Sequence, residues 1–185
     1  PEAVAAATCR FDTVAHAVDC VILTIQSGLP MAKIELLDAM MVRGFNAYAQ
    51  ADLPEKPHLF LEFHGTDAGV AEQMQAFRDI AEDFAVEAWQ TATRTEDRSA
   101  LWSMREKAHY ASAALGPGKH IMPTDVCVPI SQLAEAVAQA QRDARQLGLT
   151  CTIVGHVGDG NFHAGLSVDP QNSDEMARAK TFCDQ

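Results

Sequence analysis

Hydrophobic and polar positions follow two different periods along this chain, and each period predicts a kind of element. The segment His58–His64 alternates strictly and predicts a strand with one buried face. The segment from Asp67 to about Glu87 repeats its apolar positions every three or four residues, which is typical of an amphipathic helix. The apolar positions of these two segments are Leu59, Leu61 and Phe63, and Val70, Met74, Phe77, Ala81 and Phe84, respectively.

The first half of the chain carries three more predicted strands and two more helices. Short apolar or alternating runs predict strands at Val4–Cys9, Lys33–Leu37 and Ala88–Thr93. One helix should begin at Asp12 as its cap and stop at Gly28, and a shorter one should end near Tyr48. Residues 52–57 contain two prolines and predict a loop. The predicted order is βαβ(α)βαβ.

The second half repeats this order without its last strand. It follows a helix around residues 101–105 and a break at 116–118. The expected elements are a strand near Thr124–Val128, a helix from Ser131 to Gly148, a hairpin of Cys151–His156 with His163–Val168, and a helix from Ser173. The order predicts an α+β fold of two ferredoxin-like βαββαβ halves, about residues 1–93 and 120–185, with mainly antiparallel sheets, helices on one face and a truncated second half.

The composition indicates a globular chain. Hydrophobic residues make up 48% of the 185 residues, and no apolar run approaches the ~20 residues that a membrane helix needs. The net charge of -11 would repel a phosphate backbone, so nucleic acid is not an expected partner. The five cysteines form no CxxC pair, which predicts reduced thiols and a cytoplasmic location. A location at the periphery of the inner membrane is the alternative. Because the chain begins with Pro1 and stops within a predicted helix, we expect a piece of a longer protein.

The strongest chemical signal is the segment Gly155–His163. Three glycines allow a tight connection between strands, and the flanking His156 and His163 can converge on one divalent ion if they share a face of the hairpin. Two ordinary hydrogen-bonded histidines are the alternative. Asp159 is a candidate third ligand, although an Asp in a turn commonly caps its own backbone. Without a carboxylate ligand, we expect only weak metal binding by the chain alone.

A second candidate site lies on the predicted helix around residues 101–110. Arg105 and His109 would be neighbours one turn apart and could together meet a small carboxylate, or Arg105 could pair with an acid on a solvated face. His64 is expected to be an ordinary surface residue of the sheet. The glycine-rich segments lack the strand–turn–helix context of a dinucleotide-binding loop, and Gly116–Lys119 lacks the rest of a P-loop.

Five stretches in order along the chain resemble the C-terminal substrate domain of FAD-linked 2-hydroxy acid dehydrogenases of the vanillyl-alcohol-oxidase type. The resemblance is closest to members that oxidise D-lactate and reduce a cytochrome. The stretches are Ala32–Asp38, Leu59–Gly65, Leu101–Arg105, Thr124–Ser131 and Gly155–His163.

The resemblance implies roles for particular residues. His156 and His163 would ligate zinc or manganese near the substrate hydroxyl, and Arg105 would bind the substrate carboxylate. Asn161 is the candidate for a cofactor contact. At two positions where relatives that act on 2-hydroxyglutarate carry Thr and Lys, this chain has His109 and Pro123, which favours a smaller substrate such as D-lactate and places His109 beside the substrate.

The resemblance also implies what other parts of the protein would supply. FAD would be held mainly by a flavin domain outside these residues. A later Glu-His-Gly segment would supply the catalytic base and the carboxylate metal ligand. We therefore expect the chain alone to be inactive. The implied activity is oxidation of D-lactate to pyruvate, with a cytochrome or quinone as acceptor. Alternatives are glycolate or 2-hydroxyglutarate oxidation, and a non-catalytic module that binds a small ligand. A homodimer is compatible with the sequence.

Overall fold

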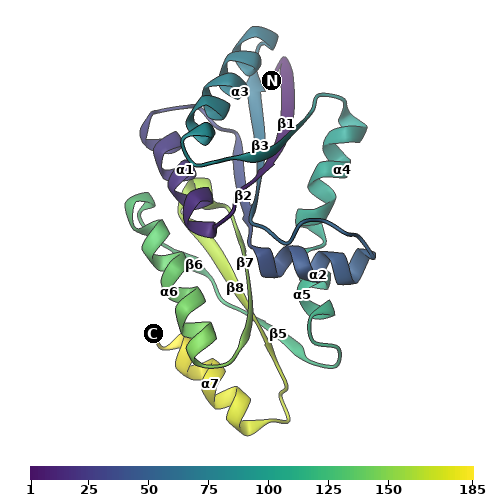
Figure 1. The fold of residues 1–185 in the computed structure, drawn as a ribbon, viewed down its shortest axis with the longest axis vertical. Helices are drawn as coiled ribbons and strands as arrows, with labels where there is room; N and C mark the ends of the chain where they lie inside the picture. Colours follow the sequence, from purple (N-terminus) through teal and green to yellow (C-terminus); the bar gives the residue numbers. More distant parts are fainter.

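The computed structural model describes residues 1–185, and one antiparallel sheet of eight strands runs through its middle (Figure 1). The strands follow one another across the sheet in the order β4-β1-β3-β2-β7-β8-β5, and β6 pairs with β8 beside β5. The strands are β1 (Ala3–Arg10), β2 (Lys33–Leu37), β3 (His58–Gly65), β4 (Glu87–Ala92), β5 (His120–Pro123), β6 (Val126–Cys127), β7 (Thr150–Gly155) and β8 (Asn161–Val168).

Seven α-helices cover both faces of this sheet. Helices α1, α3, α6 and α7 lie on one face, and α2, α4 and α5 lie on the other (Figure 1). The α-helices are α1 (Val14–Gln26), α2 (Ala39–Ala49), α3 (Asp67–Glu82), α4 (Thr95–Glu106), α5 (Ala108–Ala114), α6 (Leu133–Gln146) and α7 (Ser173–Cys183). Two short 3₁₀ helices, η1 (Ile130–Gln132) and η2 (Val157–Asp159), precede α6 and β8.

The predicted α+β class and the antiparallel pairing are confirmed. The expected hairpin is present, with β7 and β8 paired from Thr150↔Ser167 to Val154↔His163. The two halves do not form separate sheets, because β2 pairs with β7 through Leu36↔Gly155 and Leu37↔Val154. This short pairing, which we call the seam, joins the halves in the middle of the sheet.

The expectation that all helices lie on one face is wrong. Central strands carry apolar residues on both sides: Leu59 and Leu61 face the core under α1 and α3, whereas Phe60 faces α2 and α5. A sheet with two apolar faces must be covered on both. The site described below lies on the face of α2, α4 and α5.

Several element boundaries also differ from the predictions. Thr13 rather than Asp12 caps α1, accepting from the His16 amide, and Ser131 lies within η1 instead of capping α6. The strand expected at Thr124–Val128 is split into β5 and β6 around Thr124 and Asp125. Helix α3 ends at Glu82, five residues before the predicted end.

Candidate functional site

The carboxylate of Glu35 lies at the seam between the two halves. Its side chain is only 3% exposed, although it points to the face that carries α4. Because Leu36 pairs with Gly155, Glu35 lies beside His156. Glu35 Oε2 accepts a hydrogen bond of 2.7 Å from Arg105 Nε, and Oε1 contacts His156 Nδ1. One buried carboxylate thus joins two of the predicted site residues.

His156 and His163 lie on the same face of the hairpin. His163 pairs with Val154, whose side chain packs beside Leu37, on the same side of β2 as Glu35. His163 Nδ1 lies 3.1 Å from the Thr124 carbonyl oxygen and 3.5 Å from Asp125 Oδ1. Because carbonyl and carboxylate oxygens accept and do not donate, these contacts favour, for each neutral imidazole, the tautomer with the hydrogen on Nδ1 and the lone pair on Nε2. Neither Nε2 atom has a hydrogen-bond partner in the chain.

These two imidazoles fit part of a metal centre. Neutral imidazoles held through Nδ1 are typical metal ligands in proteins. However, the chain brings together no group of three His, Cys, Asp or Glu side chains that could hold an ion. Asp159 is exposed in η2, and its carboxylate makes no hydrogen bond. Further ligands would have to come from water, substrate or another part of the protein.

Arg105 lies at the end of α4 with a quarter of its side chain exposed. Its Nε is held by Glu35, and its two Nη atoms have no hydrogen-bond partner in the chain. The helix predicted to carry both Arg105 and His109 breaks at Lys107, so these two residues lie on α4 and α5. His109 is exposed and lies edge-on to the Tyr110 ring. Arg105 and His156 therefore meet at the Glu35 carboxylate, whereas His109 is not a neighbour of Arg105 on the same helix.

A second group of charges lies next to Glu35 on the same face. Lys33 Nζ lies 3.7 Å from Glu62 Oε1 and 5.2 Å from the centroid of the Trp102 ring, one turn before Arg105. His64 Nε2 contacts Glu62 Oε1 at 2.7 Å, and the imidazole is partly exposed, as predicted for a surface residue. Glu35 and Glu62 thus each contact one basic side chain and one imidazole on this face.

The glycines of the predicted motif allow the backbone to approach closely. A Cβ on Gly160 would lie 2.1 Å from the Val128 carbonyl oxygen, and its φ of 72° also favours glycine. A Cβ on Gly155 would lie 2.4 Å from Phe162 Cα. Asn161, the candidate cofactor contact, donates to Asp125 Oδ1 at 2.8 Å and to the Val126 carbonyl oxygen at 3.2 Å. In this structure the Asn161 amide thus ties the hairpin to β6.

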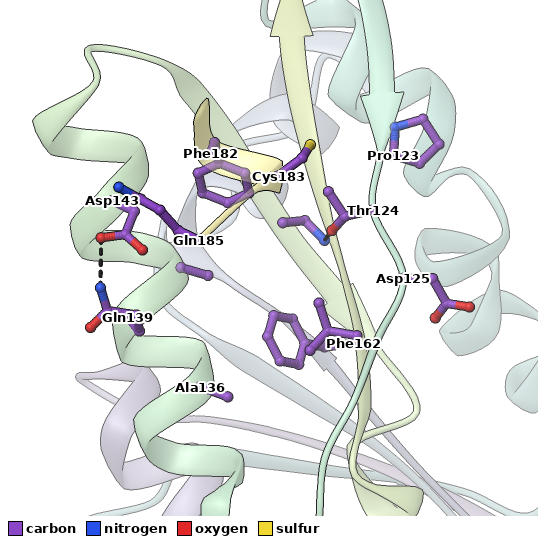
Figure 2. Close-up of a pocket in the computed structure, with 13 residues that line it drawn as sticks. Pro123, Thr124, Asp125, Ala136, Gln139, Asp143, Phe162, Phe182, Cys183 and Gln185 are labelled. Atoms are coloured by element: carbon purple, nitrogen blue, oxygen red, sulfur yellow. Dashed lines mark hydrogen bonds between the residues drawn. The ribbon is translucent and has the colours of Figure 1, made fainter. Parts of the chain in front are cut away.

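A cavity of about 460 Å³ lies on the opposite face of β8 (Figure 2). Phe162 and Ala164 line it and alternate along β8 with His163, so the cavity does not include the histidine site. Its polar lining includes Asp143, whose Oδ1 accepts from Gln139 Nε2 at 2.7 Å. A smaller cavity of about 90 Å³ borders His156, Lys33 and Asp159. The cavity that borders His156 is therefore small within this chain.

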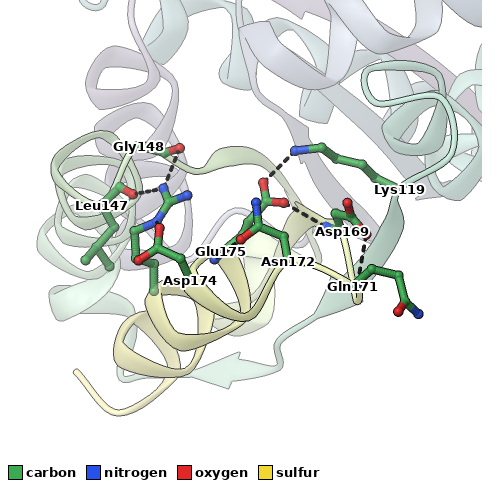
Figure 3. A network of polar contacts seen from close by, with 9 residues as sticks. Lys119, Leu147, Gly148, Asp169, Gln171, Asn172, Asp174 and Glu175 are labelled. Atoms are coloured by element: carbon green, nitrogen blue, oxygen red, sulfur yellow. Dashed lines mark hydrogen bonds and ion pairs between the residues drawn. The ribbon is translucent and has the colours of Figure 1, made fainter.

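A third polar cluster holds α7 in place and lies at the far end of the sheet (Figure 3). Glu175 accepts from Lys119 Nζ and from the Asp169 amide, and these partners lower the pKa of its carboxyl group. Arg178 donates to the carbonyl oxygens of Leu147 and Gly148 at the end of α6. These contacts satisfy helix ends and need no functional explanation.

Known proteins resemble this chain at the level of family, sequence and fold. A family model described as FAD linked oxidases, C-terminal domain, matches residues 1–185. A probable mitochondrial D-lactate dehydrogenase of Danio rerio is 39% identical over 185 residues, which cover 100% of this chain and 37% of the relative. The mitochondrial D-lactate dehydrogenase (cytochrome) of Arabidopsis thaliana is 37% identical over 180 residues, which cover 97% of this chain and 32% of the relative. The chain thus spans about a third of the length of these relatives.

Solved structures share the fold at low sequence identity. A 4-ethylphenol oxidase from Gulosibacter chungangensis matches with a TM-score of 0.69 and 10% identity, over 98% of this chain and 42% of that one. A p-cresol methylhydroxylase matches with a TM-score of 0.63 and 15% identity, over 100% of this chain and 42% of that one. These likenesses show the fold alone.

Proposed function

Since the chain belongs to the family of C-terminal domains of FAD-linked oxidases, we propose that it is the substrate- and metal-binding domain of an FAD-dependent D-2-hydroxy acid dehydrogenase. The proposed reaction is oxidation of D-lactate to pyruvate. The names of the D-lactate dehydrogenases that match at 39% and 37% identity support this substrate. We further propose one domain of two halves, residues 1–93 and 120–185, with FAD held mainly by another part of the protein.

The observation that carries the proposal is the pair of contacts at Glu35. Arg105 is held through Nε, so its outward Nη atoms can donate two hydrogen bonds to the carboxylate of a 2-hydroxy acid. On the other oxygen of Glu35, His156 is held so that Nε2 is available to a metal ion. A 2-hydroxy acid carries its hydroxyl one carbon from its carboxylate, which suits two neighbouring groups of this kind.

We propose that His156 and His163 bind zinc or manganese and that Arg105 positions the substrate, with exposed His109 at the outer end of the substrate site. A bound flavin would supply an acceptor for the hydride from the 2-carbon of the substrate, and a bound metal ion would supply a Lewis acid that lowers the pKa of the substrate hydroxyl. Arg105 fixes the orientation of the substrate carboxylate. Glu35, buried beneath Arg105, keeps the guanidinium in place.

Glycolate and 2-hydroxyglutarate remain alternative substrates of the same class. A glycolate oxidase subunit of Bacillus subtilis is 31% identical over 151 residues, and a D-2-hydroxyglutarate dehydrogenase of Danio rerio is 24% identical over 157 residues. The names of the cytochrome-linked relatives support a cytochrome as electron acceptor, with a quinone as the alternative. No helix of the chain combines the length and apolarity needed to cross a membrane.

The test is steady-state turnover of the full-length flavoprotein on D-lactate, L-lactate, glycolate and D-2-hydroxyglutarate, with cytochrome c and a quinone analogue as acceptors. We expect the highest kcat/KM for D-lactate and loss of bound metal in His156→Ala. A higher kcat/KM for glycolate or 2-hydroxyglutarate would identify that 2-hydroxy acid, instead of D-lactate, as the substrate. Ligand binding without flavin reduction would instead favour the non-catalytic module.

A further inference from the structure

Glu35 has two partners of different kinds, and both belong to the proposed site. The carboxylate is almost fully buried at the seam. Arg105 Nε donates a hydrogen bond to one of its oxygens, and His156 Nδ1 contacts the other. A buried charge is costly unless it is paired, and the Arg105 guanidinium supplies the opposite charge. A carboxylate oxygen attracts an N–H and repels a nitrogen lone pair, so this contact favours the tautomer of His156 that carries its hydrogen on Nδ1.

From this geometry we infer that Glu35 is a positioning residue that fixes the tautomer of His156. The inference rests on the proposed function, because it concerns how the site that we propose there is prepared for its metal. With the hydrogen on Nδ1, the lone pair of His156 is on Nε2, the atom that has no partner within the chain. Such partners of metal-bound histidines typically set ring orientation and metal affinity.

The substitution Glu35→Gln tests this inference with little change of shape. The amide oxygen can still accept from Arg105 Nε, but the amide nitrogen would then face His156 Nδ1 and donate to it. His156 would have to accept at Nδ1 and would carry its hydrogen on Nε2. The variant therefore places a hydrogen on the atom proposed to bind the metal.

Glu62→Gln is a matched control on the neighbouring strand. Glu62 is also well buried, with a side chain 12% exposed, and it also contacts a basic side chain and an imidazole, those of Lys33 and His64. It contacts neither Arg105 nor His156. Loss of one carboxylate charge from this face is therefore common to both variants, whereas the change at His156 is specific to Glu35→Gln.

The first measurement is Zn²⁺ affinity of the full-length, FAD-loaded protein after removal of metal, in competition with a chromophoric chelator. We expect Glu35→Gln to weaken Zn²⁺ binding by about 10–100-fold and Glu62→Gln by less than about threefold. Equal Zn²⁺ affinity in wild type and Glu35→Gln would overturn the inference. A wild-type protein that binds no Zn²⁺, or keeps it in His156→Ala, would instead contradict the proposed metal site.

The second measurement is the tautomer itself, from ¹⁵N shifts of histidine-labelled, metal-free protein, with His156→Gln to identify the His156 signals. Wild type and Glu62→Gln should show the hydrogen on Nδ1 of His156, and Glu35→Gln should show it on Nε2. Because the wild-type spectrum alone tests the inference, a variant that does not fold leaves it falsifiable. A neutral wild-type His156 with its hydrogen on Nε2 and none on Nδ1 would overturn it.

Discussion

At the scale of single residues, Arg105 offers a direct test of the substrate site. Lys at this position keeps the charge but cannot supply two parallel hydrogen bonds from a planar fork. We expect Arg105→Lys in the full-length enzyme to lower kcat/KM for D-lactate by roughly 30- to 1000-fold, which corresponds to about 2–4 kcal/mol. FAD content should not change. Arg142→Lys, at an exposed pair with Glu135 on α6, is the control. A decrease below about threefold would remove Arg105 from the site.

Asp38 predicts a pH dependence of stability. It caps α2 by accepting from the Met41 amide at 2.8 Å, and burial raises the pKa of its carboxyl group from 3.8 to about 6. The folded state thus binds this proton more tightly than the unfolded chain. Above pH 6 the buried charge therefore lowers the free energy of unfolding, by roughly 3 kcal/mol at most, and the loss is relieved as the pH falls toward 4.

Asp38→Asn isolates this effect because Asn also caps helices well. In urea unfolding we expect the variant to be more stable than wild type at pH 7.5 by about 1–3 kcal/mol, and the difference to shrink at pH 5. A difference that does not change between these two pH values would show that Asp38 does not titrate in this range.

The sequence indicated several residues of the candidate site but not Glu35, which lies between two of them. His156 and His163 could be placed on one face because a hairpin register follows from strand alternation. Glu35 could not, since an acid within the apolar strand Lys33–Leu37 has no visible partner until β2 is paired with β7. Glu35 contacts both Arg105 and His156, which lie 70 and 121 positions after it in the sequence. No local pattern carries that information.

At the scale of elements, helices α2 and α5 cross unusually closely. A Cβ on Gly44 would lie 2.3 Å from the Ala111 carbonyl oxygen. Helix propensity alone would make Gly44→Ala stabilising by about 1 kcal/mol. We expect the opposite sign, a loss of roughly 1–3 kcal/mol in the free energy of unfolding, because a backbone atom cannot move aside cheaply. Ala47→Gly, exposed on the same helix, measures the propensity effect alone. A more stable Gly44→Ala variant would show that the two helices separate readily.

Element prediction succeeded where periodicity and breakers agree. The bounds of β2 match the prediction, and β3 begins where residues 52–57 end as a loop. No glycine or proline marks the break between α4 and α5 at Lys107, so the sequence predicts one helix there. Pro123 can end β5 because β5 is an edge strand, and an edge strand tolerates the missing N–H.

At the scale of the whole molecule, the two halves share one core. The largest buried cluster combines side chains of α1, α3 and the first strands with five from the second half: Leu133, Val137, Ile153, Val157 and Phe162. Element order predicted the two halves, but the shared core and the coverage of both faces depend on which strands pair across the halves. The sequence pattern of neither half alone predicts the pairing of β2 with β7.

Because the core is shared, we expect a substitution that destabilises one half to destabilise the other half as well. Ile153→Ala should cost roughly 2–5 kcal/mol. Hydrogen exchange should then accelerate in β1 and β3 as well as in β7. Leu166→Ala, in the separate cluster beneath α7, is the comparison and should act mainly on β8 and α7. Acceleration confined to β7 and β8 in Ile153→Ala would show that the halves open independently.

The contact between Lys33 and Trp102 gives the protein a built-in optical signal. The chain has two tryptophans, and the other, Trp89, lies on the far face of the sheet with its ring against Phe77. Trp102 and Arg105 share one turn of α4, so a displacement of that turn must also carry the indole away from the ammonium group. Since indole emission responds to nearby charge, the fluorescence of a Trp89→Phe variant would report movement of the arginine without any attached dye.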